Sequence, residues 1–96
     1  MKFEWDVGNE KINVRKHNIA FSEACYVFAD PFMLTIFDPD HSENEERWIT
    51  IGQTIKGKIL TVVHTYRHNK DNEIVRIISA RKATENEAKY YVERRT

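Results

Sequence analysis

The sequence predicts an α+β domain in which two N-terminal helices precede a four-stranded antiparallel sheet and a C-terminal helix. Apolar residues recur every three or four positions before residue 31, whereas the segments between 32 and 80 are rich in Ile, Val, Thr and aromatic residues, as strands are. The connections between the strand-like segments are short, which favours antiparallel neighbours. A chain of 96 residues has the size of one domain, so we expect a single domain over 1–96.

The first expected helix begins at Asp6 or Asn9, either of which can cap it, and runs to about His17. Asn18 follows, and asparagine tolerates the left-handed conformation that commonly ends a helix. Ahead of this helix, Phe3–Trp5 alternates apolar and polar residues. This segment is either a short edge strand or an apolar anchor.

The second expected helix ends at Asp30–Pro31, because the residue before a proline avoids the helical conformation. We expect Ser22 to cap its N-terminus. Its apolar face is formed by residues at helical spacing, namely Phe21, Ala24, Cys25 and Phe28. Because Cys25 lies on this face, we interpret it as a core residue rather than a nucleophile.

The four expected strands are Phe32–Phe37, Arg47–Gln53, Lys58–Arg67 and Glu73–Ala80. Side chains alternate along a strand, so Ile77, Ser79 and Arg81 are predicted to share one face, with Arg76, Ile78 and Ala80 on the other. After the last strand, Thr84–Glu87 fits a capping box, which predicts a final helix over about 84–94. The free N–H groups at the start of such a helix attract anions.

Composition limits the class of protein. Hydrophobic residues make up 41% and charged residues 31% of the chain, an ordinary balance for a globular protein, and no apolar run is long enough to span a membrane. The N-terminus lacks a signal pattern, and the single Cys25 suits a reducing compartment, so we expect a cytoplasmic protein. No glycine-rich phosphate loop is present, and we expect no cofactor.

Charge is distributed unevenly along a chain whose formal net charge is zero. Residues 1–55 contain 5 Lys and Arg against 10 Asp and Glu, whereas residues 56–96 contain 10 against 5. A basic region could bind a polyanion while the acidic region binds a basic partner, although a merely uneven scatter of surface charge is an equally good explanation.

A set of basic residues could carry phosphate chemistry. Cleaving RNA without a metal requires a base for the 2′-hydroxyl proton, cations for the charge that builds on phosphorus, and an acid for the leaving 5′-oxygen. Histidine titrates near neutral pH, which makes His17 and His64 candidates for proton transfer. We expect Arg67 and Arg81, near the ends of neighbouring strands, to converge on the phosphate, although the hairpin register is not readable from sequence. The full basic set is Lys16, His17, Arg67, Arg76, Arg81 and Lys82.

An acidic set lies between the first two expected strands: Asp38, Asp40, His41, Glu43, Glu45 and Glu46. Carboxylates and imidazole can hold a metal, but the spacing lacks the ligand rhythm of a calcium loop and a second histidine at helical spacing. We therefore interpret it as a solvated loop and expect no metal site. The residues alone leave an enzyme and a non-catalytic module that binds nucleic acid or a partner both open.

The chain resembles the BrnT family of toxins over nearly its whole length. The resemblance rests on Phe3–Asp6, Asn13, Lys16–His17, Ile19, Phe21, Glu23–Ala24, Val27–Phe28, Asp30–Pro31, Asp40–Ser42, Glu46–Arg47, Ile51–Gly52, Gly57, Val62–Val63, Thr65, Arg67, Arg76–Ala83 and Tyr90–Tyr91. BrnT proteins are ribonuclease toxins of bacterial type II toxin–antitoxin systems, with a fold similar to that of RelE. The resemblance therefore implies a RelE-like fold and metal-independent RNA cleavage that inhibits translation.

The resemblance also implies site residues and partners. It assigns Arg67 and Arg81 to the phosphate charge with Lys82 assisting, His17 to proton transfer, and Tyr90 or Tyr91 to base stacking or proton transfer. His64 stands where tyrosine is usual in the family. Remaining RNA contacts are expected from Lys16, His64, Arg76 and Ser79. The implied partner is a BrnA-like antitoxin, in a heterotetramer with two toxins, and DNA is contacted only through the antitoxin.

Overall fold

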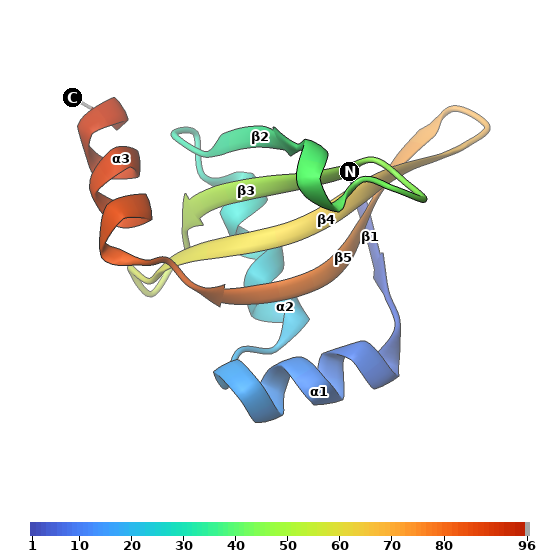
Figure 1. Cartoon of the computed structure of the whole chain (residues 1–96), viewed down its shortest axis with the longest axis horizontal. Coiled ribbons are helices and arrows are strands. Elements are labelled where there is room, and N and C mark those ends of the chain that lie inside the picture. Colours follow the sequence, from blue (N-terminus) through green and yellow to red (C-terminus); the bar gives the residue numbers. More distant parts are fainter. Residues whose placement is uncertain (96) are drawn as a thin grey trace.

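The computed structural model describes residues 1–95 and contains one five-stranded sheet with the strand order β1–β5–β4–β3–β2 (Figure 1). The strands are β1 (Lys2–Trp5), β2 (Leu34–Asp38), β3 (Arg47–Gln53), β4 (Ile59–Asn69) and β5 (Asn72–Lys82). The helices are α1 (Val7–His17), α2 (Phe21–Ala24) and α3 (Glu85–Arg95), with 3-10 turns η1 (Cys25–Ala29) and η2 (Pro39–His41). The predicted α+β class is confirmed, but the predicted order of two helices, four strands and one helix is incomplete, because the strand β1 precedes α1 and the second helix continues as the 3-10 turn η1.

The sheet is mixed rather than purely antiparallel, which corrects the prediction of four antiparallel strands. β2 to β5 form the expected antiparallel meander, but β1 adds a fifth strand parallel to β5, with Phe3 opposite Val75 and Trp5 opposite Ile77. Phe3 and Trp5 both pack against the hydrophobic core, which explains the alternation seen in the sequence. The Phe3–Trp5 segment is therefore an edge strand.

The core lies on one face of the sheet, which we call the inner face and which α2 and η1 cover. Leu60 and Val62 of β4 are fully buried there, against Val27 of η1. A Cβ on Gly52 would lie 2.9 Å from Val27, so only glycine allows η1 to approach β3 this closely. Cys25 is half-buried beside this cluster, and burial raises the pKa of its thiol to about 11, as expected of a core cysteine.

The start of the second helix differs from the prediction. Its N-cap residue is Ala20, which provides no side-chain hydrogen bond, and Ser22 lies exposed inside the helix. The backbone N–H of Phe21 instead donates to the carboxylate of Glu10 on α1, 2.8 Å away. A tertiary contact thus replaces the local cap, and the helix begins two residues earlier than its side-chain signal indicated.

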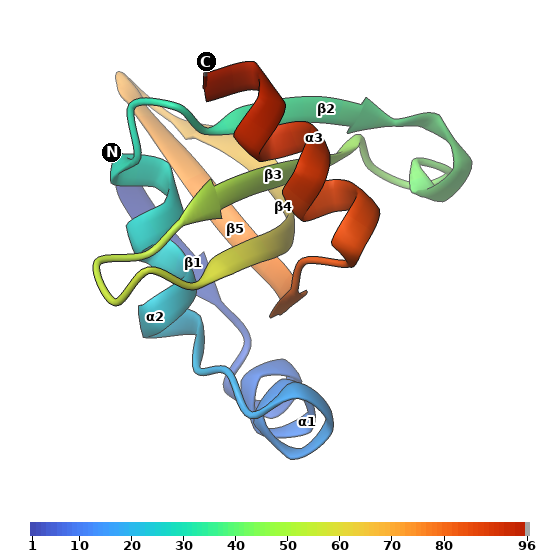
Figure 2. The ribbon, with the colours of Figure 1, turned by 90° about the vertical axis from the view of Figure 1, so that its left-hand side faces the viewer.

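The opposite, outer face carries α3 at one end, so that α2 and α3 lie on opposite sides of the sheet (Figure 2). The Thr84 hydroxyl accepts from the N–H of Glu87 at 3.1 Å, and the Glu87 carboxylate accepts from the N–H of Thr84 at 2.9 Å. This confirms the capping box. In the first helix, Asp6 accepts from the N–H of Asn9, and Asn18 ends the helix with φ 56°, both as predicted.

A β-bulge in β5 changes which side chains share a face. Val63 and His64 are consecutive in β4 but pair with Ser79 and Ile77, so Ile78 is an extra residue. The extra residue puts Arg76 on the same outer face as Arg81, opposite Thr65 and Thr61 respectively. The predicted placement of these two arginines on opposite faces is therefore wrong.

Helix α1 is attached to the edge of β5 by a buried asparagine. The side-chain amide of Asn13 donates to the carbonyls of Ile19 and Ala80 at 2.9 Å, and its oxygen accepts from the N–H of Ala80 at 3.0 Å. Ile12, an apolar residue of the same helix, is 51% exposed. A polar contact, and not an apolar face, thus fixes the position of α1. No helix in residues 1–95 is long and apolar enough to cross a membrane.

Replacing Asn13 by alanine should lower the free energy of unfolding by about 2–4 kcal/mol, because it leaves buried backbone groups of Ala80 and Ile19 without partners. Urea denaturation of the purified chain measures this. Asn9→Ala, one turn earlier on an exposed part of α1, is the matched control and should cost less than about 0.5 kcal/mol. Equal losses in the two variants would contradict the role of Asn13.

Candidate functional site

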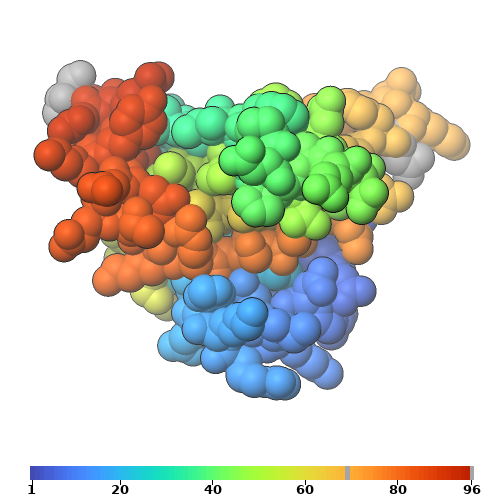
Figure 3. Space-filling model, in the orientation of Figure 1, coloured from blue at the N-terminus to red at the C-terminus, as the bar shows by residue number. Residues whose placement is uncertain are grey.

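A cavity of about 520 Å³ lies between α1 and the outer face of β5, and we call it the α1–β5 pocket. None of the described residues that line it is acidic. Figure 3 shows the three parts of the chain that frame this side of the molecule: α1, β5 and the loop before β3. The pocket is lined by Asn9, Ile12, Asn13, Lys16, His17, Arg47, Ile78, Ser79 and Arg81.

Helical spacing explains why several residues of α1 line the α1–β5 pocket. Asn9, Asn13 and Lys16 follow one another at three- and four-residue intervals, so the side of α1 that Asn13 holds against β5 also presents Lys16. Lys16 and His17 are exposed and occupy the last turn of α1, where the negative end of the helix dipole favours cations. No ion pair joins either side chain to another residue of the described chain.

Arg81 is held in the pocket by a carboxylate from α3. Its guanidinium donates two hydrogen bonds to Glu87, at 2.6 and 3.0 Å, and the hydroxyl of Thr61 donates to the same carboxylate at 3.0 Å. The hydrogen bonds from Arg81 are the main reason that the pKa of Glu87 falls to about 2. Glu87 engages only part of the guanidinium, and 36% of the Arg81 side chain is exposed, so N–H groups remain for an anion.

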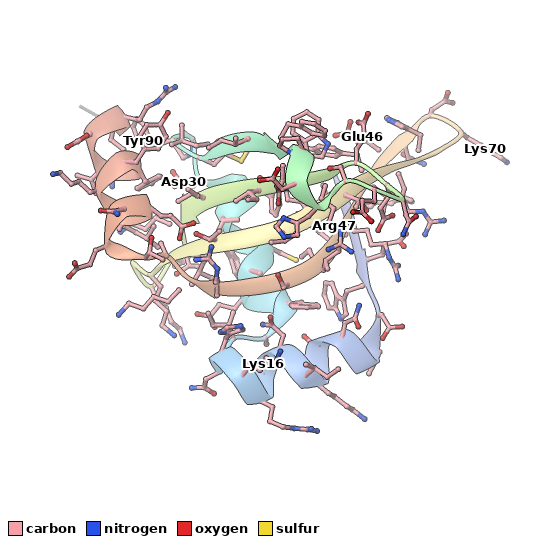
Figure 4. All side chains as sticks on the ribbon, in the orientation of Figure 1. Lys16, Asp30, Glu46, Arg47, Lys70 and Tyr90 are labelled. Carbon is pink, nitrogen blue, oxygen red and sulfur yellow. The ribbon has the colours of Figure 1, made fainter. Side chains whose placement is uncertain are left out.

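Arg47 also reaches the α1–β5 pocket, and it was missing from the predicted site. It begins β3 and lies opposite Asp38, with Ile49 and Ile51 continuing its side of the strand on the outer face. Figure 4 labels Arg47 at the start of β3 and Lys16 on α1, which lies below the sheet in this view. Strand alternation predicts that Arg47 and Ile49 share one face of β3. Only the fold shows that residues of α1 lie next to this face.

Arg67 and Arg81 do not converge. Both lie on the outer face, but Arg81 pairs with Thr61, six positions before Arg67 on β4, which separates the two backbones by roughly 20 Å. Arg67 and Arg76 instead share the carboxylate of Glu4, at 2.7 and 2.5 Å. The expected convergence is wrong because the two arginines stand at opposite ends of one hairpin.

Two of the remaining predicted residues are exposed but lie outside the α1–β5 pocket. Lys82 pairs with Leu60, so it projects to the other side of β5 from Arg81. Tyr90 is 46% exposed on α3, where the guanidinium of Arg94 lies 5.8 Å from its ring centre (Figure 4). Neither residue joins the groups that meet around His17 and Arg81.

Tyr91 is fully buried, and its hydroxyl donates to the carboxylate of Asp30. Burial, followed by that carboxylate, raises the pKa of Tyr91 to about 12. The Asp30 carboxylate also accepts from the N–H of Gln53, so Tyr91 attaches α3 to the end of β3. The structure corrects the prediction that Tyr91 faces the substrate, and it gives this residue a structural role.

His64 is likewise fully buried, on the inner face. Its Nε2 lies 2.7 Å from the Thr50 hydroxyl, and its ring lies edge-on to Phe28 with the ring centres 5.0 Å apart. Burial lowers the pKa of His64 to about 4, so the ring is neutral at physiological pH. The prediction that His64 contacts RNA is therefore corrected, and the imidazole that stays accessible at the α1–β5 pocket is that of His17.

The acidic loop forms a separate cavity of about 340 Å³ next to Arg47. Its best defined contact joins Nδ1 of His41 to the Asp38 carboxylate at 2.8 Å. Within residues 1–95, no group of three or more His, Cys, Asp or Glu side chains is arranged to hold a metal ion. The loop therefore brings carboxylates beside Arg47 without a recognisable ligand set.

Together these features define a small α+β domain with a cationic, histidine-bearing pocket at the edge of its sheet, suited to a phosphodiester. A sequence profile described as the ribonuclease toxin BrnT of type II toxin–antitoxin systems matches residues 5–87. The chain therefore belongs to the BrnT family of ribonuclease toxins. Membership implies an RNA substrate and an antitoxin partner.

A solved structure supports the fold. The crystal structure of the Brucella abortus ribonuclease toxin BrnT superimposes with a TM-score of 0.61 at 21% sequence identity, covering 88% of this chain and 99% of that one. Comparison with curated protein sequences gave no match.

The burial of His64 predicts a pH effect on stability. Its pKa is about 6.5 in the unfolded chain and about 4 in the folded one, so the unfolded state takes up the proton first as pH falls from 6.5 to 4. The free energy of unfolding should fall by about 2–3 kcal/mol over this range because of His64 alone. His64→Gln should flatten the measured dependence of unfolding free energy on pH by that amount.

The control for this measurement is His68→Gln, because His68 is an exposed histidine on the same strand. It should leave the pH dependence as it is in the parent chain. An unchanged slope in His64→Gln would show that His64 becomes protonated in the folded state as readily as in the unfolded one.

Proposed function

We propose that this chain cleaves RNA without a metal ion, in the α1–β5 pocket, and inhibits translation by doing so. The observation that carries the proposal is the meeting of His17, Lys16, Arg47 and Arg81 around one cavity, with no acidic side chain in its lining. A phosphodiester in that cavity would have three cations and one titratable imidazole within reach. The family gives RNA as the substrate, and the pocket supplies the groups that the reaction needs.

The reaction is attack of a ribose 2′-oxygen on the adjacent phosphorus. A base takes the 2′-hydroxyl proton, the new O–P bond forms as the bond to the 5′-oxygen breaks, and an acid protonates that oxygen. The products are a 2′,3′-cyclic phosphate and a free 5′-hydroxyl. His17 performs proton transfer, and Arg81, oriented by Glu87, stabilises the charge that develops on the phosphoryl oxygens together with Lys16.

The partner in this proposal is a BrnA-like antitoxin. Two toxin chains bind an antitoxin dimer in a heterotetramer, and DNA is contacted only through the antitoxin. The acidic half of the chain is available for a basic partner, since the loop that carries Asp40, Glu43 and Glu45 is exposed. The proposed compartment is the cytoplasm, where both the RNA and the antitoxin are made.

Removing the pocket's free groups should abolish cleavage while the fold survives. His17→Ala should lower kcat for a single-stranded RNA by about 100-fold or more, and Lys16→Ala should lower kcat/KM by at least about tenfold. Lys11→Ala is the matched control, because Lys11 is exposed on the same helix but does not line the pocket. A gel assay of cleavage by purified protein, with circular dichroism as the check on folding, measures all three.

Variants of Arg81 and Arg67 test where on the sheet the reaction occurs. Arg81→Ala combined with Glu87→Gln removes the guanidinium without leaving its carboxylate partner unpaired, and it should cost about 100-fold in kcat/KM. Arg67→Ala, at the far end of the hairpin, should stay within about threefold of the parent chain. A loss in Arg67→Ala as large as in the Arg81 variant would move the active centre toward the hairpin tip.

Metal independence has its own test. Cleavage measured in excess EDTA should proceed at the rate seen with magnesium, because the proposed pocket stabilises charge with Lys and Arg side chains. Restoration of activity only by an added divalent cation would contradict the proposal and favour chemistry at the acidic loop. Salt-sensitive RNA binding without any turnover would indicate a non-catalytic module instead.

A further inference from the structure

A second cavity, of about 500 Å³, lies on the other side of the end of β5. It is bounded by the C-terminal end of α1, the turn between β3 and β4, the end of β5 and the first part of α3, and we call it the α1–α3 pocket. Its volume is within the range of small-molecule sites. Nothing in the proposed reaction uses it.

The α1–α3 pocket combines an apolar floor with a cationic rim. Ile59, Ala83 and Ala88 line it and are partly exposed, whereas Ile19 and Leu60 are 4% and 0% exposed, so the first three residues supply the accessible apolar surface of the floor. Lys82 reaches the rim and has no ion pair with another described residue. An apolar floor below a free cation suits a flat, weakly polar ring joined to a phosphate, which describes a nucleotide.

The two pockets share a single residue, His17. Strand alternation sends the consecutive residues Arg81 and Lys82 to opposite sides of β5, so that one enters each pocket. An RNA strand that crosses the end of β5 at His17 would therefore meet a cation on both sides of the imidazole. A scissile phosphate beside His17 would place its neighbouring nucleosides in separate cavities.

We infer that the α1–α3 pocket binds a nucleotide next to the scissile phosphate, with the base on the apolar floor formed by Ile59, Ala83 and Ala88 and the adjoining phosphate on Lys82. This inference rests on the proposed cleavage site in the α1–β5 pocket. With the α1–α3 pocket occupied, the enzyme binds the RNA nucleotides on both sides of the cleaved bond. Lys82 thereby acts in substrate binding, away from the reacting atoms.

The direct test uses a dinucleotide whose 2′-hydroxyl at the cleavage position is replaced by hydrogen, so that the 2′-oxygen attack cannot occur. Added to the full chain labelled with ¹⁵N, it should shift the backbone amide signals of Gly57, Ala83 and Ala88 together with those of Ser79 and Arg81. Shifts at Ser79 and Arg81 alone overturn the α1–α3 inference and leave the proposed function standing. No shift around either pocket overturns both.

Filling the pocket is the second test. Ala88→Phe places a ring in the cavity from α3 and should raise KM for dinucleotide cleavage by about tenfold or more, with kcat changed much less. Asn86→Phe adds the same ring to an exposed position of α3 that does not line the pocket, and it should leave KM unchanged. Equal KM values in the two variants overturn the inference.

The variant Lys82→Gln tests the contribution of the cationic rim to binding separately from that of the apolar floor. It should weaken binding of the uncleavable dinucleotide about tenfold when that dinucleotide carries a terminal phosphate, and it should not affect the same dinucleotide without one. Probes phosphorylated at the 5′ end or at the 3′ end show which flanking nucleotide the pocket holds. An equal loss with and without the terminal phosphate overturns the assignment of Lys82.

Discussion

The side-chain amide of Asn13 is the contact on which the position of the site depends. β1 pairs with one edge of β5 only as far as Ile77, and beyond that point this edge has no neighbouring strand, whereas the other edge stays paired with β4. The Asn13 amide fills this place, because it donates to and accepts from Ala80 as a neighbouring peptide group would. A helix, α1, therefore lies at the position beside β5 that a further strand would occupy. This helix forms the wall of the α1–β5 pocket that carries Lys16 and His17.

Two consecutive residues of β5, Ala80 and Arg81, are held by hydrogen bonds from two different helices. Ala80 is bonded to α1 through Asn13, and Arg81 is bonded to α3 through Glu87, whose carboxylate also joins Thr61 and the cap at Thr84. The capping box thus orients the arginine as well as starting the helix. Because one carboxylate serves both purposes, the position of α3 and the direction of the guanidinium are coupled.

The sequence predicted the features that depend on near neighbours, and it failed where distant segments meet. The capping box and the left-handed Asn18 follow from residues within one turn, and both were predictable. The bulge at Ile78 was not, because it depends on how β4 pairs with β5, and one extra residue puts Arg76 and Arg81 on the same face instead of opposite faces. His64 looked like a proton-transfer group because alternation cannot tell which face of β4 the helices cover.

Carboxylate partners, more than the number of cations, determine how many free N–H groups each basic residue can offer to RNA, and Arg81 keeps some of its own although it is paired with Glu87. Arg67 and Arg76 have the residue type that a phosphate requires, but Glu4 occupies both, and the hydrogen bond from Arg76 is the main reason that the pKa of Glu4 is lowered. Lys16, Arg47 and Lys82 have no ion pair within the described chain, and these three line the pockets on either side of His17. A protein of zero net charge can therefore attract a polyanion at one place, since the field at short range is set by unpaired groups and not by the total.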